Sequence, residues 1–179
     1  MVSIFDIQCP IYVILIKFDI IYFRFLTIKV MSYVLGKTYT HLLANISFDT
    51  LTADILKTVF KDGRVFSHLI EVWVAKEYNI THIKGCRGHD FVCGDNGEIK
   101  IDQKTFTGGG LSFTPSNMKG QGRVFDRDVF EKKTKDLQFC CVSNINFPEI
   151  KIKFIDGVEL LQLYPTGRIP LHDHDKFFN

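Results

Sequence analysis

Residues 88–107 consist of two short segments that flank the tetrapeptide Gly94-Asp95-Asn96-Gly97. An Asn-Gly dipeptide between two short apolar runs is the strongest short-range signal for a β-hairpin. Within the second segment, successive side chains point to opposite faces of the expected strand. One face carries Ile99, Ile101, Gln103 and Thr105, and the other carries Lys100, Asp102, Lys104 and Phe106. We therefore expect Asp102 and Lys104 to lie side by side.

The face with Asp102 and Lys104 suits a metal-dependent reaction. The hairpin folds back on itself, so we expect the carboxylate of Asp90 to lie near both residues. Mg²⁺ prefers oxygen ligands and often takes only one or two protein carboxylates, which leaves room for water and a substrate phosphate. A lysine could orient or help deprotonate an attacking water, or stabilise charge that develops on the phosphate. These residues predict Mg²⁺-assisted hydrolysis of a phosphodiester.

The same residues carry a resemblance to a known family. Gly88-His89-Asp90, followed after eleven residues by Asp102-Gln103-Lys104, resembles the acidic residue plus (Asp/Glu)-x-Lys signature of the restriction-endonuclease-like, or PD-(D/E)XK, nuclease superfamily. Within it, Asp-x-Lys-Thr is most similar to type II restriction endonucleases. The family often has Pro before the first Asp, and this chain has His89 there. Counting the flanking elements, the resemblance covers residues 64–145.

The resemblance implies both a fold and an activity. The fold is α/β, with a restriction-endonuclease-like core in which helices flank a central mixed β-sheet. The activity is Mg²⁺-dependent cleavage of double-stranded DNA at a specific sequence, by a homodimer whose two-fold symmetry matches that of the site. One alternative is a structure-specific or repair nuclease, such as a Holliday-junction resolvase, on the same core. Another is a non-catalytic DNA-binding or zinc-stabilised module.

Two amphipathic segments before the hairpin predict helices. The first, capped by Ser47 or Asp49, ends at residues 62–63 and has Leu51, Ile55, Leu56 and Val59 at helical spacing. The second spans residues 64–78, and its expected apolar face is Val65, Leu69, Val72 and Trp73. In the resembled family a helix here often supplies a further carboxylate, for which Glu71 is the candidate. The alternative is that Glu71 is a solvent-exposed residue of an amphipathic helix.

Four potential zinc ligands precede and enter the hairpin, namely His82, Cys86, His89 and Cys93. Their residue types suit zinc, but structural zinc ligands usually come as two close pairs separated by a longer loop. These four are evenly spaced through what reads partly as a strand. The other interpretation is buried cysteines in a strand with a histidine near the active site.

The segment after the hairpin predicts contact with nucleic acid. Gly108-Gly109-Gly110 permits a sharp change of direction or close approach of the backbone to a ligand. The following loop has side chains suited to following phosphates and reading base edges, and the alternative is an ordinary polar surface loop. The candidate DNA-binding residues are Ser112, Thr114, Asn117, Lys119, Gln121 and Arg123.

The C-terminal part predicts a helix, a strand and a second hairpin. Residues 126–138 read as a mixed-charge helix with a solvated face, and residues 139–142 as a buried strand. Residues 150–154 and 158–163 flank Asp156-Gly157, which predicts a hairpin. The order of hairpin, helix and strand matches the resembled α/β core. Residues 172–175, His-Asp-His-Asp, could bind metal weakly, although a polar terminal segment is more often mobile.

Composition limits the remaining classes. At 179 residues, 46% of them hydrophobic, the chain is long enough for one globular domain with a real core. Its net charge of +2 requires any DNA binding to come from local patches. The five cysteines are odd in number and two are adjacent, which argues against a secreted disulfide framework and favours a cytoplasmic setting.

The first 30 residues differ from the rest. They are rich in Ile, Phe, Tyr and Val, but charged residues interrupt every stretch before it reaches the roughly 18–20 apolar residues of a membrane span. They also lack the order of features of a secretory signal. Either they form a β-rich N-terminal segment, or Met31 is the true start and they are not native coding sequence. We therefore expect residues 31–179 to form a single nuclease domain without a membrane anchor.

Overall fold

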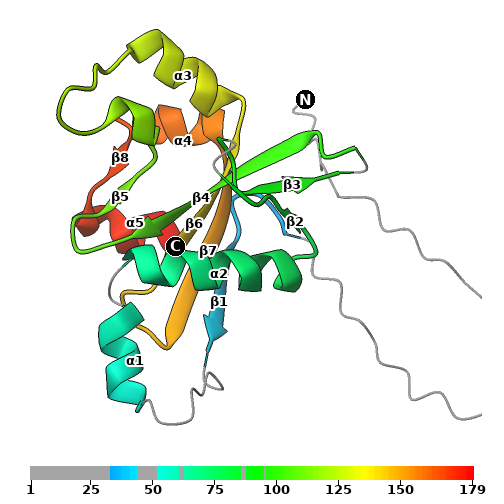
Figure 1. Cartoon of the computed structure of the whole chain (residues 1–179), viewed down its shortest axis with the longest axis vertical. Helices are drawn as coiled ribbons and strands as arrows, with labels where there is room; N and C mark the ends of the chain where they lie inside the picture. Colours follow the sequence, from blue (N-terminus) through cyan, green and yellow to red (C-terminus); the bar gives the residue numbers. More distant parts are fainter. Residues whose placement is uncertain (1–32, 44–51, 61–62, 86–87, 95) are drawn as a thin grey trace, which may run out of the picture.

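A computed structural model describes residues 33–43, 52–60, 63–85, 88–94 and 96–179 of the chain. Residues 1–30 and the expected helix caps Ser47 and Asp49 lie outside this part. The fold is mixed α/β, as the sequence predicts, with a curled six-stranded sheet at its centre (Figure 1).

The six-stranded sheet combines antiparallel strands with one parallel pair. In spatial order its strands are β1 (Thr38–Leu42), β7 (Glu149–Asp156), β6 (Gln138–Ser143), β4 (Ile99–Phe106), β3 (Phe91–Cys93) and β2 (Thr81–His82). Only β4 and β6 run parallel, and all the other neighbours are antiparallel. A parallel pair needs a long crossover connection, and here the segment between the two strands contains a helix. The buried strand predicted at residues 139–142 is confirmed as part of β6.

The predicted hairpin is confirmed as β3 and β4. Phe91 pairs with Ile101 and Cys93 with Ile99, and the N–H of Gly97 donates a 3.1 Å hydrogen bond to the carbonyl of Gly94 across the turn. Both glycines have positive φ, which favours residues without a Cβ atom. The alternation of faces along β4 is also confirmed, since Ile101 lies in one core and Phe106 in the other.

Two helices cover one face of the sheet. They are α1 (Ala53–Phe60) and α2 (Gly63–Glu77), and Figure 1 shows α2 lying across the strands. The apolar face predicted for α2 is right only in part. Leu69 and Trp73 pack against the core, but Val65 and Val72 are exposed, and the fully buried residues are Phe66, Ile70 and Val74. The second set repeats every four residues and forms an equally continuous stripe.

The opposite face carries a second core. It is covered by α3 (Arg127–Lys135), α4 (Gly157–Leu163), α5 (His174–Phe178) and a separate two-stranded sheet of β5 (Leu111–Ser112) and β8 (Arg168–Ile169). Short 3-10 turns, η1 (Ser116–Met118) and η2 (Leu171–Asp173), connect these elements. A helix is confirmed within the predicted range 126–138, but α3 ends at Lys135 and Gln138 already begins β6. The carboxylate of Asp126 caps its first turn.

The predicted second hairpin is wrong, because residues 157–163 form α4. Asp156 ends β7 and its Oδ1 atom accepts a 2.8 Å hydrogen bond from the N–H of Val158, which caps the helix. Asp is favoured both at helix starts and in turns, since in both its side-chain oxygen accepts a hydrogen bond from a free backbone N–H. β7 instead pairs with two strands that precede it in the sequence, with β6 on one side and the distant β1 on the other.

The polar C-terminal segment is not a mobile tail. Residues 171–178 form η2 and α5, and His174, Phe177 and Phe178 are buried. His174 shares a 2.7 Å hydrogen bond with the hydroxyl of Ser143, and its other ring nitrogen lies 2.8 Å from Asp175. The polar residues at positions 172–175 favoured a solvated tail, but Phe177 and Phe178, which follow them, pack into the core. Among the described residues, no helix combines the length and apolar character needed to cross a membrane.

Candidate active site

A pocket of about 470 Å³ opens beside β4. Its walls come from the hairpin, the C-terminal end of α3 and the start of η1. The pocket brings together four predicted catalytic residues and one predicted DNA-binding residue, which are Glu71, Asp90, Asp102, Lys104 and Asn117. Among these five residues, Glu71 and Asn117 are 46 positions apart in the sequence and still line one cavity.

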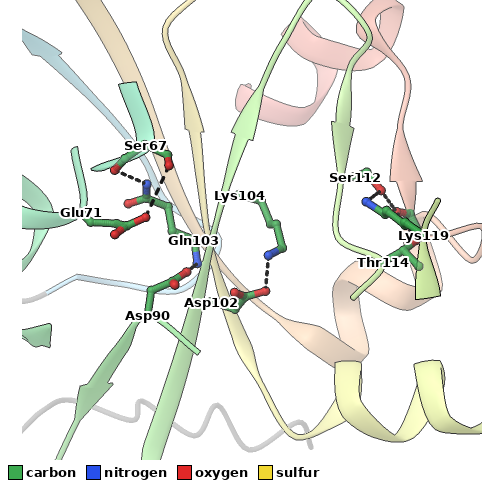
Figure 2. A network of polar contacts seen from close by, with 10 residues as sticks. Ser67, Glu71, Asp90, Asp102, Gln103, Lys104, Ser112, Thr114 and Lys119 are labelled. Carbon is green, nitrogen blue, oxygen red and sulfur yellow. Dashed lines mark hydrogen bonds and ion pairs between the residues drawn. The ribbon is translucent and has the colours of Figure 1, made fainter. Parts of the chain in front are cut away.

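Asp102 and Lys104 form a close ion pair on β4. Nζ of Lys104 lies 2.6 Å from Oδ2 of Asp102, and the side chain of Asp102 is 16% exposed (Figure 2). Burial raises the pKa of Asp102 to about 6, and the charge of Asp90 and a hydrogen bond with it act in the same direction. Lys104 opposes these effects by stabilising the carboxylate. The pair predicted from strand alternation is therefore present.

Asp90 lies directly before β3 and extends its pairing with β4. Its N–H donates a 2.9 Å hydrogen bond to the carbonyl of Ile101. Its carboxylate oxygen Oδ2 accepts a 2.6 Å hydrogen bond from the backbone N–H of Gln103. This second bond holds the Asp90 side chain against β4, next to Asp102. The hairpin therefore places Asp90 as the sequence predicts.

Glu71 reaches the same pocket from α2. Its side chain is 16% exposed, so the interpretation of Glu71 as a solvent-exposed residue is wrong. Oε2 lies 3.4 Å from His82 and 3.8 Å from His68, and Oε1 accepts a 3.5 Å hydrogen bond from the hydroxyl of Ser67. Burial raises the pKa of Glu71, and the charge of Asp90 raises it further. Glu71 therefore belongs to the same electrostatic group as Asp90.

Gln103 links α2 to β4 behind the carboxylates. Its side chain points to the face opposite that of Lys104, where its Nε2 atom donates a 3.3 Å hydrogen bond to the carbonyl of Ser67 (Figure 2). Gln103 is only 7% exposed. Within the described part of the chain its Oε1 atom is buried without a hydrogen-bond partner. The residue between Asp102 and Lys104 thus fixes the distance of Glu71 from the hairpin.

The donor set fits a magnesium ion held by few protein ligands. Within the described ranges, no group of three or more His, Cys, Asp or Glu side chains is arranged to hold a metal. The close carboxylates of Asp90 and Asp102 nevertheless offer the oxygen atoms that Mg²⁺ prefers, and it commonly binds through one or two carboxylates plus substrate phosphate. Burial is the main cause that raises the pKa of Asp102, and the charge of Asp90 adds to it. A divalent cation held by the two carboxylates would stabilise their ionised forms.

The loop residues predicted to bind DNA fall into three groups. Asn117 lines the pocket, while Lys119, Gln121 and Arg123 are exposed outside its walls. Arg123 donates to the carbonyl of Ser116, and Lys119 donates to the hydroxyl of Ser112. The hydroxyls of Ser112 and Thr114 both donate to the carbonyl of Gly167, at 3.3 Å and 3.4 Å. Those two hydroxyls therefore hold β5 and the start of the loop to the residue directly before β8, a structural role that their residue types did not reveal.

Sequence reasoning missed the wall that α3 contributes. Lys133, Thr134 and Asp136 line the pocket opposite the hairpin. The mixed charges of α3 predicted a solvated face, and no local pattern distinguishes Lys133 from the neighbouring lysines. Its place in the pocket follows only from the parallel pairing of β4 with β6, which brings the end of α3 beside the start of β4.

The four potential zinc ligands do not all belong to the described part. Cys86 lies outside it, His82 contacts Glu71, and His89 lines the pocket. Cys93 is buried in the core on the α2 side of the sheet. Cys93 is thus a buried strand cysteine and His89 a histidine beside the candidate site, which agrees with the alternative to a zinc site.

Comparison with known protein families, with curated proteins and with solved structures finds no match.

Proposed function

We propose that this protein is a Mg²⁺-dependent endodeoxyribonuclease that hydrolyses phosphodiester bonds of double-stranded DNA, most similar to a type II restriction endonuclease. The observation that carries the proposal is the pocket shared by Asp90, Asp102 and Lys104. Two carboxylates and a lysine on adjacent strands are the chemistry that such hydrolysis needs. Glu71 is a further metal ligand or a residue that positions one.

Bound Mg²⁺ would act as a Lewis acid toward the phosphate and would favour ionisation of a water molecule. Asp90 and Asp102 would hold the ion. The hydrogen bond from Gln103 N–H fixes one oxygen of Asp90, and Lys104 fixes one oxygen of Asp102. Both carboxylates are thus oriented before any ion binds, which lowers the entropy lost on binding.

Lys104 has the position for two tasks in the reaction. Its ammonium group donates hydrogen bonds, so it can orient the water whose oxygen forms the new bond to phosphorus. As the bond to the leaving oxygen breaks, negative charge grows on the phosphate, and the nearby positive charge of Lys104 stabilises it. The attacking water releases a proton to solvent, and the leaving oxygen takes a proton from solvent. Lys104 is 25% exposed, so water reaches it without a change in the fold.

The fold supports the family-level part of the proposal. A restriction-endonuclease-like core would use the β3–β4 hairpin, α3 and β6 as its catalytic unit, and these elements occur here in that order. We propose a homodimer because a two-fold symmetric DNA site calls for a two-fold symmetric protein. A cytoplasmic location agrees with Cys140 and Cys141, which are buried free thiols in the described part of the chain.

The test is incubation of the purified protein with plasmid and phage DNA, in Mg²⁺ and in EDTA, followed by gel electrophoresis. Discrete fragments that require Mg²⁺ are the expected result. A smear would show that the protein cleaves DNA without sequence specificity, which would contradict a restriction enzyme. Cleavage of branched DNA alone would favour the resolvase-like alternative, and no cleavage of any substrate would contradict the nuclease.

A further inference from the structure

The β5–β8 pair brings a cation to the active-site side that no sequence pattern singled out. Arg168 lies on β8 directly opposite Ser112 of β5. Its guanidinium donates to the carbonyl of Gly109, in the glycine turn that follows β4. The turn is closed by Thr107, whose N–H donates to the carbonyl of Gly110 at 3.1 Å. Arg168 is therefore anchored to the strand that carries Asp102 and Lys104.

Lys119 approaches the same place from η1. Its Nζ donates to the hydroxyl of Ser112, the residue opposite Arg168. In Figure 2, Lys119, Ser112 and Thr114 lie on the side of Lys104 away from Asp90 and Glu71. Burial lowers the pKa of Lys119, and the positive charges of Lys104 and Arg168 lower it further. The three cations are therefore close enough to repel one another.

The two outer cations lack a carboxylate partner. Within the described residues, neither Lys119 nor Arg168 forms an ion pair, and each donates only to a neutral oxygen. Asp102 attracts Lys119 weakly, but Asp102 is already paired with Lys104. Nearby cations that no carboxylate neutralises repel each other and produce a local positive potential that attracts anions. Such an arrangement favours binding of a phosphate.

We propose that Lys119 and Arg168 form a phosphate-binding subsite that holds the DNA backbone next to the bond that is cut. The inference rests on the proposed nuclease function and extends it by naming where the strand runs beyond the active site. The strand would pass from the carboxylates, across Lys104, to the β5–β8 pair. Because these contacts go to phosphate oxygens, they position the strand and carry no sequence information.

The experiment measures DNA affinity without cleavage. A short fluorescein-labelled duplex is titrated with the full chain in EDTA over a range of KCl concentrations, and the slope of log K against log[salt] is determined. The variants are Lys119→Gln and Arg168→Gln, because an amide keeps a donor toward Ser112 or Gly109 while the charge is lost. Lys176→Gln is the matched control, since Lys176 is exposed on α5 and does not line the pocket.

Each subsite variant is expected to weaken binding equally for unrelated duplex sequences and to reduce the magnitude of the slope by about 1. The control should leave the affinity and the slope unchanged. Arg168→Lys keeps the positive charge, so its slope should equal that of the wild type. An unchanged slope in both Gln variants, with thermal unfolding like that of the wild type, would overturn the subsite.

The same proteins are also tested for plasmid cleavage in Mg²⁺, which separates the two proposals. Cleavage by the wild type with unchanged slopes in the variants would overturn the subsite and leave the nuclease. Reduced slopes without any cleavage by the wild type would support the subsite and contradict the nuclease. Absence of salt-dependent DNA binding by the wild type would overturn the subsite.

Discussion

At the scale of single residues, the candidate site places charges where the fold does not favour them. Asp102 is largely buried beside another carboxylate, and Lys104 compensates only part of the cost of its charge. A site built for stability alone would have a neutral residue here. Such a conflict is expected where function requires a charged side chain.

Replacing Asp102 by Asn is expected to stabilise the metal-free protein. Burial raises the pKa of Asp102 to about 6, so at pH 7.5 the folded protein holds an unfavourable carboxylate. The amide removes that penalty, although Lys104 loses its charged partner, and the gain should be on the order of 1–3 kcal/mol. Urea unfolding in EDTA measures it. A lower free energy of unfolding than that of the wild type would contradict the electrostatic description of the site.

His41 should make stability depend on pH at a point remote from the pocket. It shares a 2.7 Å hydrogen bond with the hydroxyl of Tyr78, and burial lowers its pKa from 6.5, with Glu77 opposing part of this. The unfolded chain therefore binds a proton at His41 more readily, so stability falls as the pH drops below about 6.5.

The variant His41→Gln should lose less stability than the wild type between pH 7 and pH 5 in thermal unfolding. His172→Gln is the control, because the side chain of His172 is 81% exposed, and it should follow the wild type. Parallel pH profiles for His41→Gln and the wild type would show that His41 is not responsible.

At the scale of elements, the sequence identified most helices and strands that have a strong local pattern. The β3–β4 hairpin was predicted from its turn residues and α3 from its run of mixed charges, and both signals lie within a few positions of the sequence. α4 was mistaken for a strand because Asp156-Gly157 satisfies both turn and cap rules. What decides between them is the packing of Gly157 against α3, and this contact joins residues more than 20 positions apart.

Gly157→Ala tests that contact. A Cβ atom at Gly157 would overlap the backbone carbonyl oxygens of Thr134 and Leu137, and backbone atoms cannot move aside as a flexible side chain can. The expected destabilisation is about 3 kcal/mol or more, measured by urea unfolding. Gly108→Ala is the control, because nothing lies within 4 Å of its Cβ position, and it should be nearly neutral. Equal stability of the two variants would refute the close packing of α4 on α3.

At the scale of the whole molecule, the sheet separates two cores, and the chain ends in the second one. The site lies at the edge of that second core, where α3, η1 and the hairpin meet. The sequence predicted Asp102 and Lys104 from alternation and Asp90 from the hairpin. It did not predict Lys133 or Arg168, because their positions depend on the β4–β6 and β5–β8 pairings.

Phe178→Ala tests the closure of the second core by the C-terminal residues. Phe178 is 3% exposed, and its ring lies 5.5 Å from that of Phe106 and 5.1 Å from that of Phe177. Removing a buried phenyl ring typically costs about 3–5 kcal/mol. Urea denaturation measures the free energy of unfolding of this variant and of the control Lys176→Ala, which should resemble the wild type. Little change in Phe178→Ala would mean that the chain end does not contribute to the core.

The central claim is that Lys104 acts on a DNA phosphodiester held at the Asp90–Asp102 pair. Its most direct test is the rate of Mg²⁺-dependent plasmid cleavage by Lys104→Ala, measured beside its DNA affinity in EDTA and beside Lys176→Ala. Loss of a residue that orients the attacking water and stabilises charge in the transition state should slow cleavage by about 100-fold or more. DNA affinity should fall by much less. A wild-type cleavage rate in Lys104→Ala would contradict the assignment of this pocket as the active site.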